Sequence, residues 1–269
     1  MRFVMHPDMV YQYPIWWVGL ALASLAVLGA VSLELAARRL LPLELRRQHN
    51  DVAAAIFSII GVTYAVLLAF VAMLAWEGFN KAKAATYGEA ATVLDVYNVS
   101  LGLTEPERSA MRDDILGYTQ FVVTVEWPAQ ANGHAINRDS QYLDDLNRIA
   151  LDIRPTDAAY GALRPLLLQA VMRLQDARQE RLLTAQTTIP AIVWFVMLLG
   201  GGLTIAFGSF LGAPSVRMHL AMSATLALSG ALVVILVVAL SNPFRGDFRV
   251  TTAPFDQVRS QIMRTTKPS

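Results

Sequence analysis

Four long apolar stretches set the pattern of hydrophobic and polar positions along the chain. They cover residues 15–37, 52–76, 189–211 and 217–240. Each reaches roughly the 20 residues that an α-helix needs to cross the hydrocarbon core of a bilayer. Charged side chains occur only near their ends, at Glu34 and Arg217. The pattern predicts four transmembrane helices.

Residues 77–188, between the second and third stretches, mix polar and apolar positions at helical spacing. Apolar residues recur there at three- and four-residue steps: Ala82, Ala85, Val93, Val96 and Tyr97. This period is typical of amphipathic helices. No proline interrupts the chain from Asp51 to Leu103, so one helix is expected to leave the membrane and continue into a soluble domain. The predicted fold is all-α: four transmembrane helices, a helical soluble domain inserted between the second and third, and long helices continuous across the membrane boundary.

The two ends of the chain and the first connector are polar. Residues 1–14 lack the clustered basic residues of a secretion signal, so the first span is expected to be retained. Residues 241–269 form a basic tail that is expected to contain a short amphipathic segment. The connector after the first span places leucines among four arginines, which favours a position along the membrane surface: Arg38, Arg39, Arg46 and Arg47. These arginines favour a cytoplasmic connector, but basic residues also gather near the membrane on the opposite side, so charge leaves the orientation open.

Charge and composition exclude several classes of function. The formal net charge is +1, which offers no basic surface for nucleic acid. The chain has no cysteine, and its histidines stand apart in separate connectors, so neither a thiolate site nor a zinc site is expected. No phosphate-binding loop or nucleophile motif occurs. We therefore expect no metal, no cofactor and no enzymatic activity.

Charged residues within the helices have ordinary interpretations. Glu34 stands four residues before Arg38, which predicts an ion pair at the membrane interface, with ion binding as the alternative. The carboxylates of the soluble segment are expected on a solvated face rather than in acid–base pairs; they are Glu89, Asp95, Asp113, Asp114, Asp144 and Asp145.

Glycines mark positions where membrane helices are expected to pack closely or to bend. Glycine lowers helix stability by roughly 1 kcal/mol relative to alanine, so a run of three implies a structural reason. Gly208 and Gly212 have the spacing that lets two membrane helices approach each other. The candidates for close packing or for a hinge are Gly61, Gly200, Gly201, Gly202, Gly208 and Gly212. Of these two roles, packing is favoured.

One face of the second span has the pattern of a pore lining. The residues that recur every seven positions, and so lie near one side of the helix, are Ile56, Thr63, Phe70 and Glu77. In a ring of subunits that side would present a hydroxyl, an aromatic constriction and a ring of carboxylates; hydrophobic constrictions and charged rings both occur in channels. The alternative is that Ile56 and Phe70 contact lipid or a neighbouring helix while Glu77 lies in water.

Several motifs resemble those of one known family. They are GVTYAVLLAF at residues 61–70, Trp76-Glu77, Glu89-Ala90-Ala91 with Tyr97, Glu126-Trp127-Pro128 after Tyr118, and Asn242-Pro243-Phe244-Arg245-Gly246-Asp247 in the tail. In order and spacing they resemble the bacterial bestrophin-like domain family of unknown function, which is remotely similar to the bestrophin anion channels.

This resemblance implies an assembly and a function. Bestrophins are pentameric anion channels with four membrane helices per subunit, a pore lined by the second helix and a helical cytosolic domain. The resemblance therefore implies a homo-oligomer in the bacterial inner membrane, in contact with lipid and able to pass ions, with the pentamer resting on analogy alone. A bestrophin-type calcium site is not implied, because the tail offers only Asp247 and Asp256.

The sequence thus predicts an oligomeric ion channel whose pore is lined by the second span. A ring of Glu77 carboxylates would favour cations, which differs from the anion selectivity that the resemblance implies. The alternative is a non-conducting membrane scaffold or sensor, whose helical domain binds a partner and whose spans anchor it.

Overall fold

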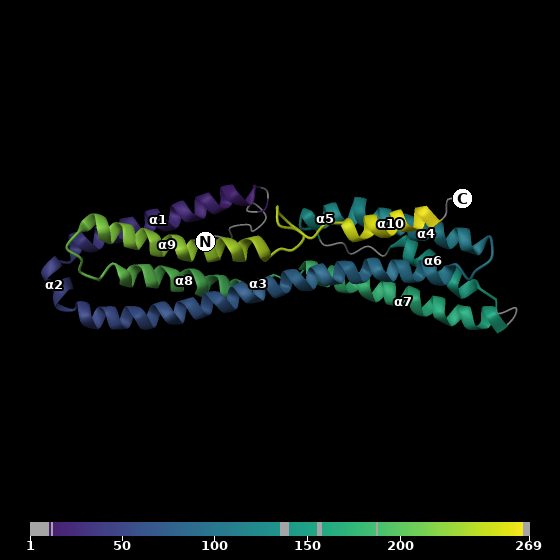
Figure 1. Cartoon of the computed structure of the whole chain (residues 1–269), viewed down its shortest axis with the longest axis horizontal. Coiled ribbons are helices and arrows are strands. Elements are labelled where there is room, and N and C mark those ends of the chain that lie inside the picture. The colour runs from purple at the N-terminus through teal and green to yellow at the C-terminus, as the bar shows by residue number, and fades with distance from the viewer. Residues whose placement is uncertain (1–10, 12, 135–139, 155–157, 187, 266–269) are drawn as a thin grey trace, which may run out of the picture. The chain divides into compact units, whose positions relative to one another are not determined.

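The computed structural model describes residues 11, 13–134, 140–154, 158–186 and 188–265, and every regular element in these residues is a helix. In chain order the elements are α1 (Ile15–Leu40), α2 (Leu43–Gln48), α3 (Asn50–Ser100), α4 (Glu107–Phe121), the π-helical turn η2 (Val122–Glu126), α5 (Trp127–Ala131), α6 (Gln141–Asp152), α7 (Ala158–Gln186), α8 (Ala191–Gly208), α9 (Val216–Leu240) and α10 (Ala253–Thr265). Figure 1 labels most of these helices. The predicted all-α fold is confirmed.

The chain forms two compact units. The first, here called the membrane unit, comprises Met1–Glu77 and Thr188–Ser241. The second, here called the soluble unit, comprises Gly78–Thr187 and Asn242–Ser269. Helix α3 contributes to both, since its 51 residues form one unbroken helix of about 75 Å. The expected continuity of this helix is confirmed, and it follows from the absence of proline in α3.

The membrane unit contains four helices long and apolar enough to cross a bilayer: α1, the first part of α3, α8 and α9. Helices α1 and α9 pack along each other, as Figure 1 shows, and small residues allow this approach. Ala30, Ala227 and Ala231 are buried there, and a Cβ atom on Gly19 would lie 3.5 Å from Ile235. Most other side chains of the four spans are exposed and apolar, which fits a surface that lipid covers.

The return path into the membrane differs from α3. Helix α7 ends at Gln186 and α8 begins at Ala191, so two helices stand where one continuous helix was expected. Pro190 directly precedes α8 with an extended backbone, φ −57° and ψ 144°. Because proline has no N–H to donate, the start of a new helix is a favourable place for it.

The soluble unit is built around an apolar core. The second part of α3, helices α4, α6, α7 and α10 each contribute fully buried side chains, among them Val93, Ile115, Leu146, Leu174 and Phe255. The tail belongs to this unit: Trp127 meets Phe244 and Phe255 edge-on, and its indole N–H donates to the Val250 carbonyl at 3.3 Å. These contacts fold the basic tail onto the helical domain.

Candidate functional site

The predicted pore residues lie on the outward face of α3. Phe70 is 67% exposed, and Ile56, Thr63 and Glu77 are exposed as well. The other side of α3 faces the rest of the membrane unit, and among its residues Leu68, Val71 and Ala75 are buried. The structure therefore brings the four candidates together on one side of α3, turned away from the rest of the membrane unit.

More residues share this outward face than the seven-residue spacing indicated. Large apolar side chains beside the candidate stripe are also exposed: Ile59, Val62, Val66 and Met73. A strict seven-residue repeat missed them because an α-helix turns once in 3.6 residues, so a face also contains positions three and four residues apart. The Thr63 hydroxyl donates to the Ile59 carbonyl at 2.9 Å, which satisfies it within the helix. The face as a whole is a broad apolar strip that ends at Glu77.

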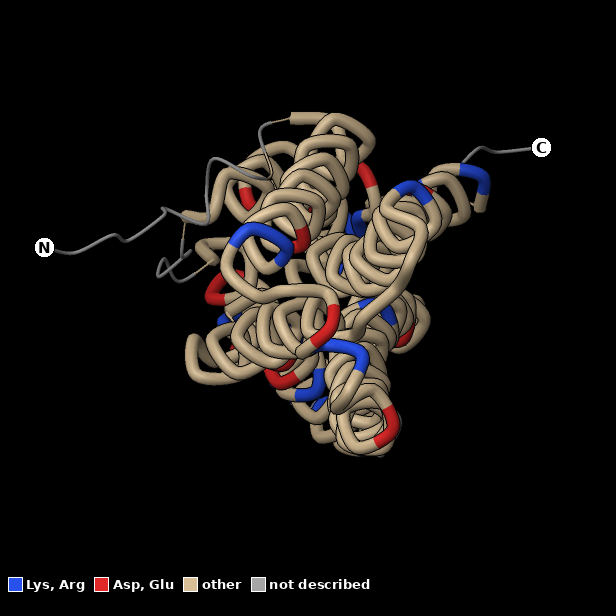
Figure 2. The backbone as a smooth tube through the Cα atoms, turned by 90° about the vertical axis from the view of Figure 1, so that its left-hand side faces the viewer, with Lys and Arg blue, Asp and Glu red and all other residues tan. Residues whose placement is uncertain are grey.

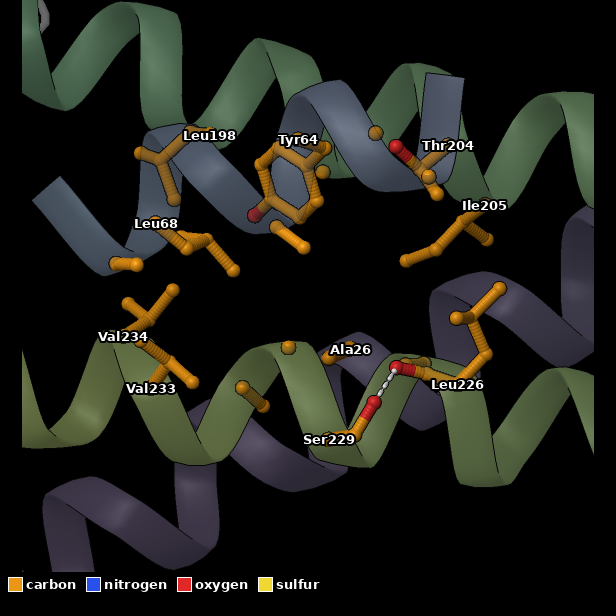
Figure 3. A pocket seen from close by; sticks show the side chains of 18 of the residues that line it. Ala26, Tyr64, Leu68, Leu198, Thr204, Ile205, Leu226, Ser229, Val233 and Val234 are labelled. Carbon is orange, nitrogen blue, oxygen red and sulfur yellow. Dashed lines mark hydrogen bonds between the residues drawn. The ribbon is translucent and has the colours of Figure 1, made fainter. Parts of the chain in front are cut away.

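A cavity of about 950 Å³ lies within the membrane unit among α1, α3, α8 and α9 (Figure 3). Its lining contains no charged side chain. The hydroxyls of Thr204 and Ser229 donate to carbonyls of their own helices, at Gly200 and Leu226 respectively. The space can accommodate hydrocarbon, and its lining contains no carboxylate or histidine that could serve in acid–base or metal chemistry.

The Tyr64 ring forms part of this cavity wall and lies against the glycine run of α8. A Cβ atom on Gly200 would stand 2.9 Å from Tyr64 Cδ2, and one on Gly201 would stand 2.6 Å from the Tyr64 hydroxyl. By contrast, a Cβ atom on Gly202 would meet nothing within 4 Å. Two of the three consecutive glycines thus occupy positions where a larger residue would have to displace an aromatic ring.

The remaining glycine candidates occupy different environments. A Cβ atom on Gly61 would meet nothing within 4 Å, and one on Gly208 would lie at an ordinary 3.4 Å from Phe57. Gly212 lies beyond the end of α8, where a Cβ atom would stand 2.8 Å from the backbone nitrogen of Arg47. Gly212 therefore permits a close approach of two backbones.

A buried ion cluster, here called the membrane-unit cluster, lies where α1, α2 and α9 meet. Arg38 Nε donates to Glu34 Oε1 at 2.7 Å, so the predicted ion pair is confirmed. Arg46 Nη2 also donates to this oxygen at 3.2 Å, and His219 Nδ1 lies 2.9 Å from it. Glu34 is completely buried. Spacing along the chain predicts the local pair alone, because Arg46 and His219 reach Glu34 only through the tertiary fold.

The same cluster holds the turn between α8 and α9. Arg46 Nη2 donates to the carbonyls of Ser209 at 2.5 Å and Leu211 at 2.7 Å. The Asn50 side chain donates to the Gly212 carbonyl at 3.0 Å and accepts from the Gly212 N–H at 2.7 Å. Carbonyls at the end of a helix lack partners within the helix and carry partial negative charge, so a guanidinium is well suited to this position.

A second buried network, here called the soluble-unit cluster, consists of Glu89, Tyr118, Glu126, Arg178 and Arg181. The expected solvated position of Glu89 is wrong. Glu89 is fully buried rather than solvated. It accepts from Arg181 Nε at 2.5 Å and from the Tyr118 hydroxyl at 2.6 Å. Arg181 also donates to Glu126, which accepts from Arg178 Nη2 at 2.6 Å. Glu89 lies on α3, and it is buried because α4 and α7 cover that side of the helix.

The surroundings of the soluble-unit cluster are apolar and aromatic. The Arg181 guanidinium carbon lies 5.5 Å from the centre of the Trp127 ring, within the range of a cation–π contact. Glu126 ends the π-helical turn η2, and such turns frequently occur at functional sites. Burial raises the pKa of Tyr118 well above its ordinary value, and the neighbouring Glu89 carboxylate raises this pKa further. Tyr118 therefore stays a neutral hydrogen-bond donor to Glu89.

Among the described residues, no group of three or more His, Asp or Glu side chains is placed to hold a metal ion. Both buried clusters pair carboxylates with arginines. Their chemistry is therefore that of ion pairing and positioning of helices.

Comparison with known proteins gives a family and a fold. Residues 15–255 match the model of the bestrophin-like domain family. No curated protein matches the sequence. A crystal structure of a bacterial bestrophin homologue from Klebsiella pneumoniae with an isoleucine-to-threonine mutation is similar to this chain, with a TM-score of 0.68 and 13% identity over 91% of this chain and 99% of that one.

Other solved structures are similar in the same way. A Klebsiella pneumoniae bestrophin homologue solved by Zn-SAD phasing has a TM-score of 0.65 and 13% identity, covering 90% of this chain and 98% of that one. A membrane protein with a proline-to-alanine mutation has a TM-score of 0.67 and 12% identity, covering 91% and 99%. These structures establish the fold, and the family model covers most of the sequence. The chain is a multi-pass membrane protein that belongs to the bestrophin-like domain family.

Proposed function

We propose that this protein assembles as a homo-oligomer and conducts ions along an axis lined by α3. The observation that carries the proposal is the outward face of α3, a strip of exposed apolar residues that begins near Val52 and ends at Glu77. Membership of the bestrophin-like family supports the same role, because bestrophins are ion channels. By that analogy the oligomer is a pentamer in a bacterial inner membrane, surrounded by lipid. The role is transport and not catalysis.

Within this proposal, the residues on α3 have separate tasks. Phe70 has the largest side chain of the four predicted pore residues and forms the constriction, where a dry apolar ring stops ions by excluding water. Ile56 and Thr63 lie on the same side of α3 and line the axis on one side of Phe70. Glu77 lies about two turns beyond Phe70 and forms a ring of carboxylates at the mouth. Such a ring attracts cations, so cation selectivity is expected.

The test is ion flux into liposomes that contain the purified protein. Phe70→Ala is expected to raise the flux, because it widens the constriction and lets water enter. The matched control is Phe195→Ala on α8: that ring is 60% exposed and the change in volume is the same, but it lies on another membrane helix. The control is expected to conduct like the unmodified protein. Equal effects of the two changes would contradict a pore lined by α3.

A second measurement separates the channel from the alternative function. Glu77→Gln is expected to weaken selectivity for cations without abolishing flux; unchanged selectivity would remove Glu77 from the mouth. If no ion gradient drives flux and the oligomer has no open or lipid-free axis, the protein is instead a membrane scaffold or sensor that does not conduct.

A further inference from the structure

The α2 end of the membrane unit carries arginines of two kinds. Arg38 and Arg46 belong to the buried membrane-unit cluster. Three others are exposed, and no hydrogen bond or ion pair engages their side chains anywhere in the part of the chain that the structure describes; they are Arg39, Arg47 and Arg217, here called the arginine rim. Figure 2 looks onto this end and shows where its basic positions lie. A guanidinium without a protein partner is free to bind an external anion.

Exposed leucines accompany the arginine rim. Leu40, next to Arg39, is 78% exposed, and Leu45, two residues before Arg47, is exposed as well. Large apolar side chains beside arginines are typical of the level where acyl chains give way to headgroups, because the arginine stem lies along hydrocarbon while the guanidinium reaches the polar layer. The leucines therefore indicate a partner that offers both hydrocarbon and an anionic group.

The surplus of positive charge at the α2 end favours the binding of an anion. It has five arginines against the carboxylates of Glu34, Glu44 and Asp51. Glu34 is buried inside the membrane-unit cluster, and Glu44 and Asp51 lie in the first turns of α2 and α3. At that position a carboxylate is stabilised by the partial positive charge of its own helix end. The surplus charge at the surface is therefore positive.

The arginine rim stands on a fixed support. The contacts of Arg46 with Ser209 and Leu211, and of Asn50 with Gly212, tie α2 and the start of α3 to the turn before α9. Because these elements are already held in place, little backbone ordering opposes the binding of a ligand. Arg39 lies in the last turn of α1, Arg47 in the last turn of α2 and Arg217 in the first turn of α9, so all three belong to this braced end.

We infer that the arginine rim binds the phosphate headgroups of anionic phospholipids in the surrounding leaflet. Arginine presents a planar fork of donors that matches phosphate and forms strong, charge-assisted hydrogen bonds with it. A lipid meets both features of the surface at once, with its phosphate on the rim and its acyl chain on the exposed leucines. This inference does not depend on ion conduction.

The test is lipid retention by the full-length protein, measured by native mass spectrometry from micelles with equal amounts of phosphatidylglycerol and phosphatidylcholine. The unmodified protein is expected to retain phosphatidylglycerol preferentially. We expect the preference to disappear in the triple variant Arg39→Gln, Arg47→Gln and Arg217→Gln. Each lost arginine is expected to lower the affinity for phosphatidylglycerol about fivefold. The corresponding changes to lysine keep the charge and are expected to keep most of the preference.

The matched control removes three exposed arginines from the soluble unit: Arg154→Gln, Arg173→Gln and Arg264→Gln. It changes the net charge equally and is expected to leave lipid retention unaltered. Equal losses in the two glutamine variants, or equal retention of both lipids by the unmodified protein, would overturn the inference. If inorganic phosphate displaces phosphatidylglycerol at equal concentration, the arginine rim binds free anions rather than lipid, and the lipid assignment is wrong.

Discussion

The two buried ion clusters neutralise charge in different ways. In the soluble-unit cluster, Glu89 and Glu126 meet Arg178 and Arg181, and every carboxylate oxygen accepts a hydrogen bond. In the membrane-unit cluster, one oxygen of Glu34 serves two arginines, and its other oxygen is buried without a partner among the described residues. The soluble unit thus balances charge with charge.

The membrane unit instead uses backbone dipoles. Arg46 and Arg38 donate to the same oxygen of Glu34, so Arg46 has only a share in one carboxylate. Arg46 also donates to the Ser209 and Leu211 carbonyls beyond the end of α8, and their partial negative charge balances the rest of its positive charge. A buried charge costs less free energy when more of its hydrogen-bonding capacity is met. A helix end can therefore take the place of a second carboxylate. We expect the two clusters to lose different amounts of stability when one partner is removed.

The largest expected effect is the loss of Arg181. Arg181→Met leaves Glu89 and Glu126 buried with too few donors, which is expected to cost about 3–5 kcal/mol of the free energy of unfolding. Unfolding in mixed micelles, followed by circular dichroism, measures this change. Arg173→Met on the exposed side of α7 is the control, with an expected change within about 0.5 kcal/mol. Similar stabilities of the two variants would mean that the soluble-unit cluster does not stabilise the fold.

Removing the carboxylate of the membrane-unit cluster is expected to cost less. Glu34→Gln keeps one oxygen acceptor, and Arg46 keeps its two carbonyls, so a loss of about 2 kcal/mol is expected. The same unfolding experiment applies, with the exposed Glu44→Gln as control. A loss as large as that of Arg181→Met would show that the carbonyls do not compensate for the shared carboxylate.

A substitution at Gly212, where two backbones approach closely, is expected to lower the free energy of unfolding slightly less. A methyl group there meets the backbone of Arg46 and Arg47 at about 3 Å, so Gly212→Ala forces α2 away from the turn and is expected to cost about 1–2 kcal/mol. Gly202→Ala is the control, because the added methyl group meets nothing within 4 Å and alanine favours a helix. Lower stability of Gly202→Ala than of Gly212→Ala would contradict this account of the turn.

The smallest expected effect concerns Tyr118 and depends on pH. Tyr118→Phe removes one hydrogen bond to Glu89 and is expected to cost about 1 kcal/mol at neutral pH. Because the pKa of Tyr118 is raised in the folded state, the unfolded chain loses this proton first as the pH rises above about 10, and stability then falls by up to about 1.4 kcal/mol per pH unit. The variant lacks this contribution, so its stability is expected to fall less steeply above pH 10. Parallel curves would exclude a buried neutral Tyr118.

Features that depend on residues close together in the chain were predictable from the sequence. The four spans, the unbroken α3 and the pair of Glu34 with Arg38 each arise from spacing along one helix. The burial of Glu89 was not predictable, because its position on α3 resembles a solvated one until α4 and α7 cover it. The partners of Arg46 have no local signal either. Arg46 and Arg47 are adjacent and chemically identical, yet one is buried and the other is exposed.

The contact of Arg46 with Ser209 has a consequence for how the protein is made. These residues are 163 positions apart, and nearly all of the soluble unit's helical segment lies between them in the chain. During synthesis from the N-terminus, the Arg46 guanidinium therefore emerges long before the carbonyls that hold it. The contact can form only after the third span and the turn that follows it have been translated and inserted, so this part of the membrane unit is completed after the helical segment Gly78–Thr187 of the soluble unit has been made.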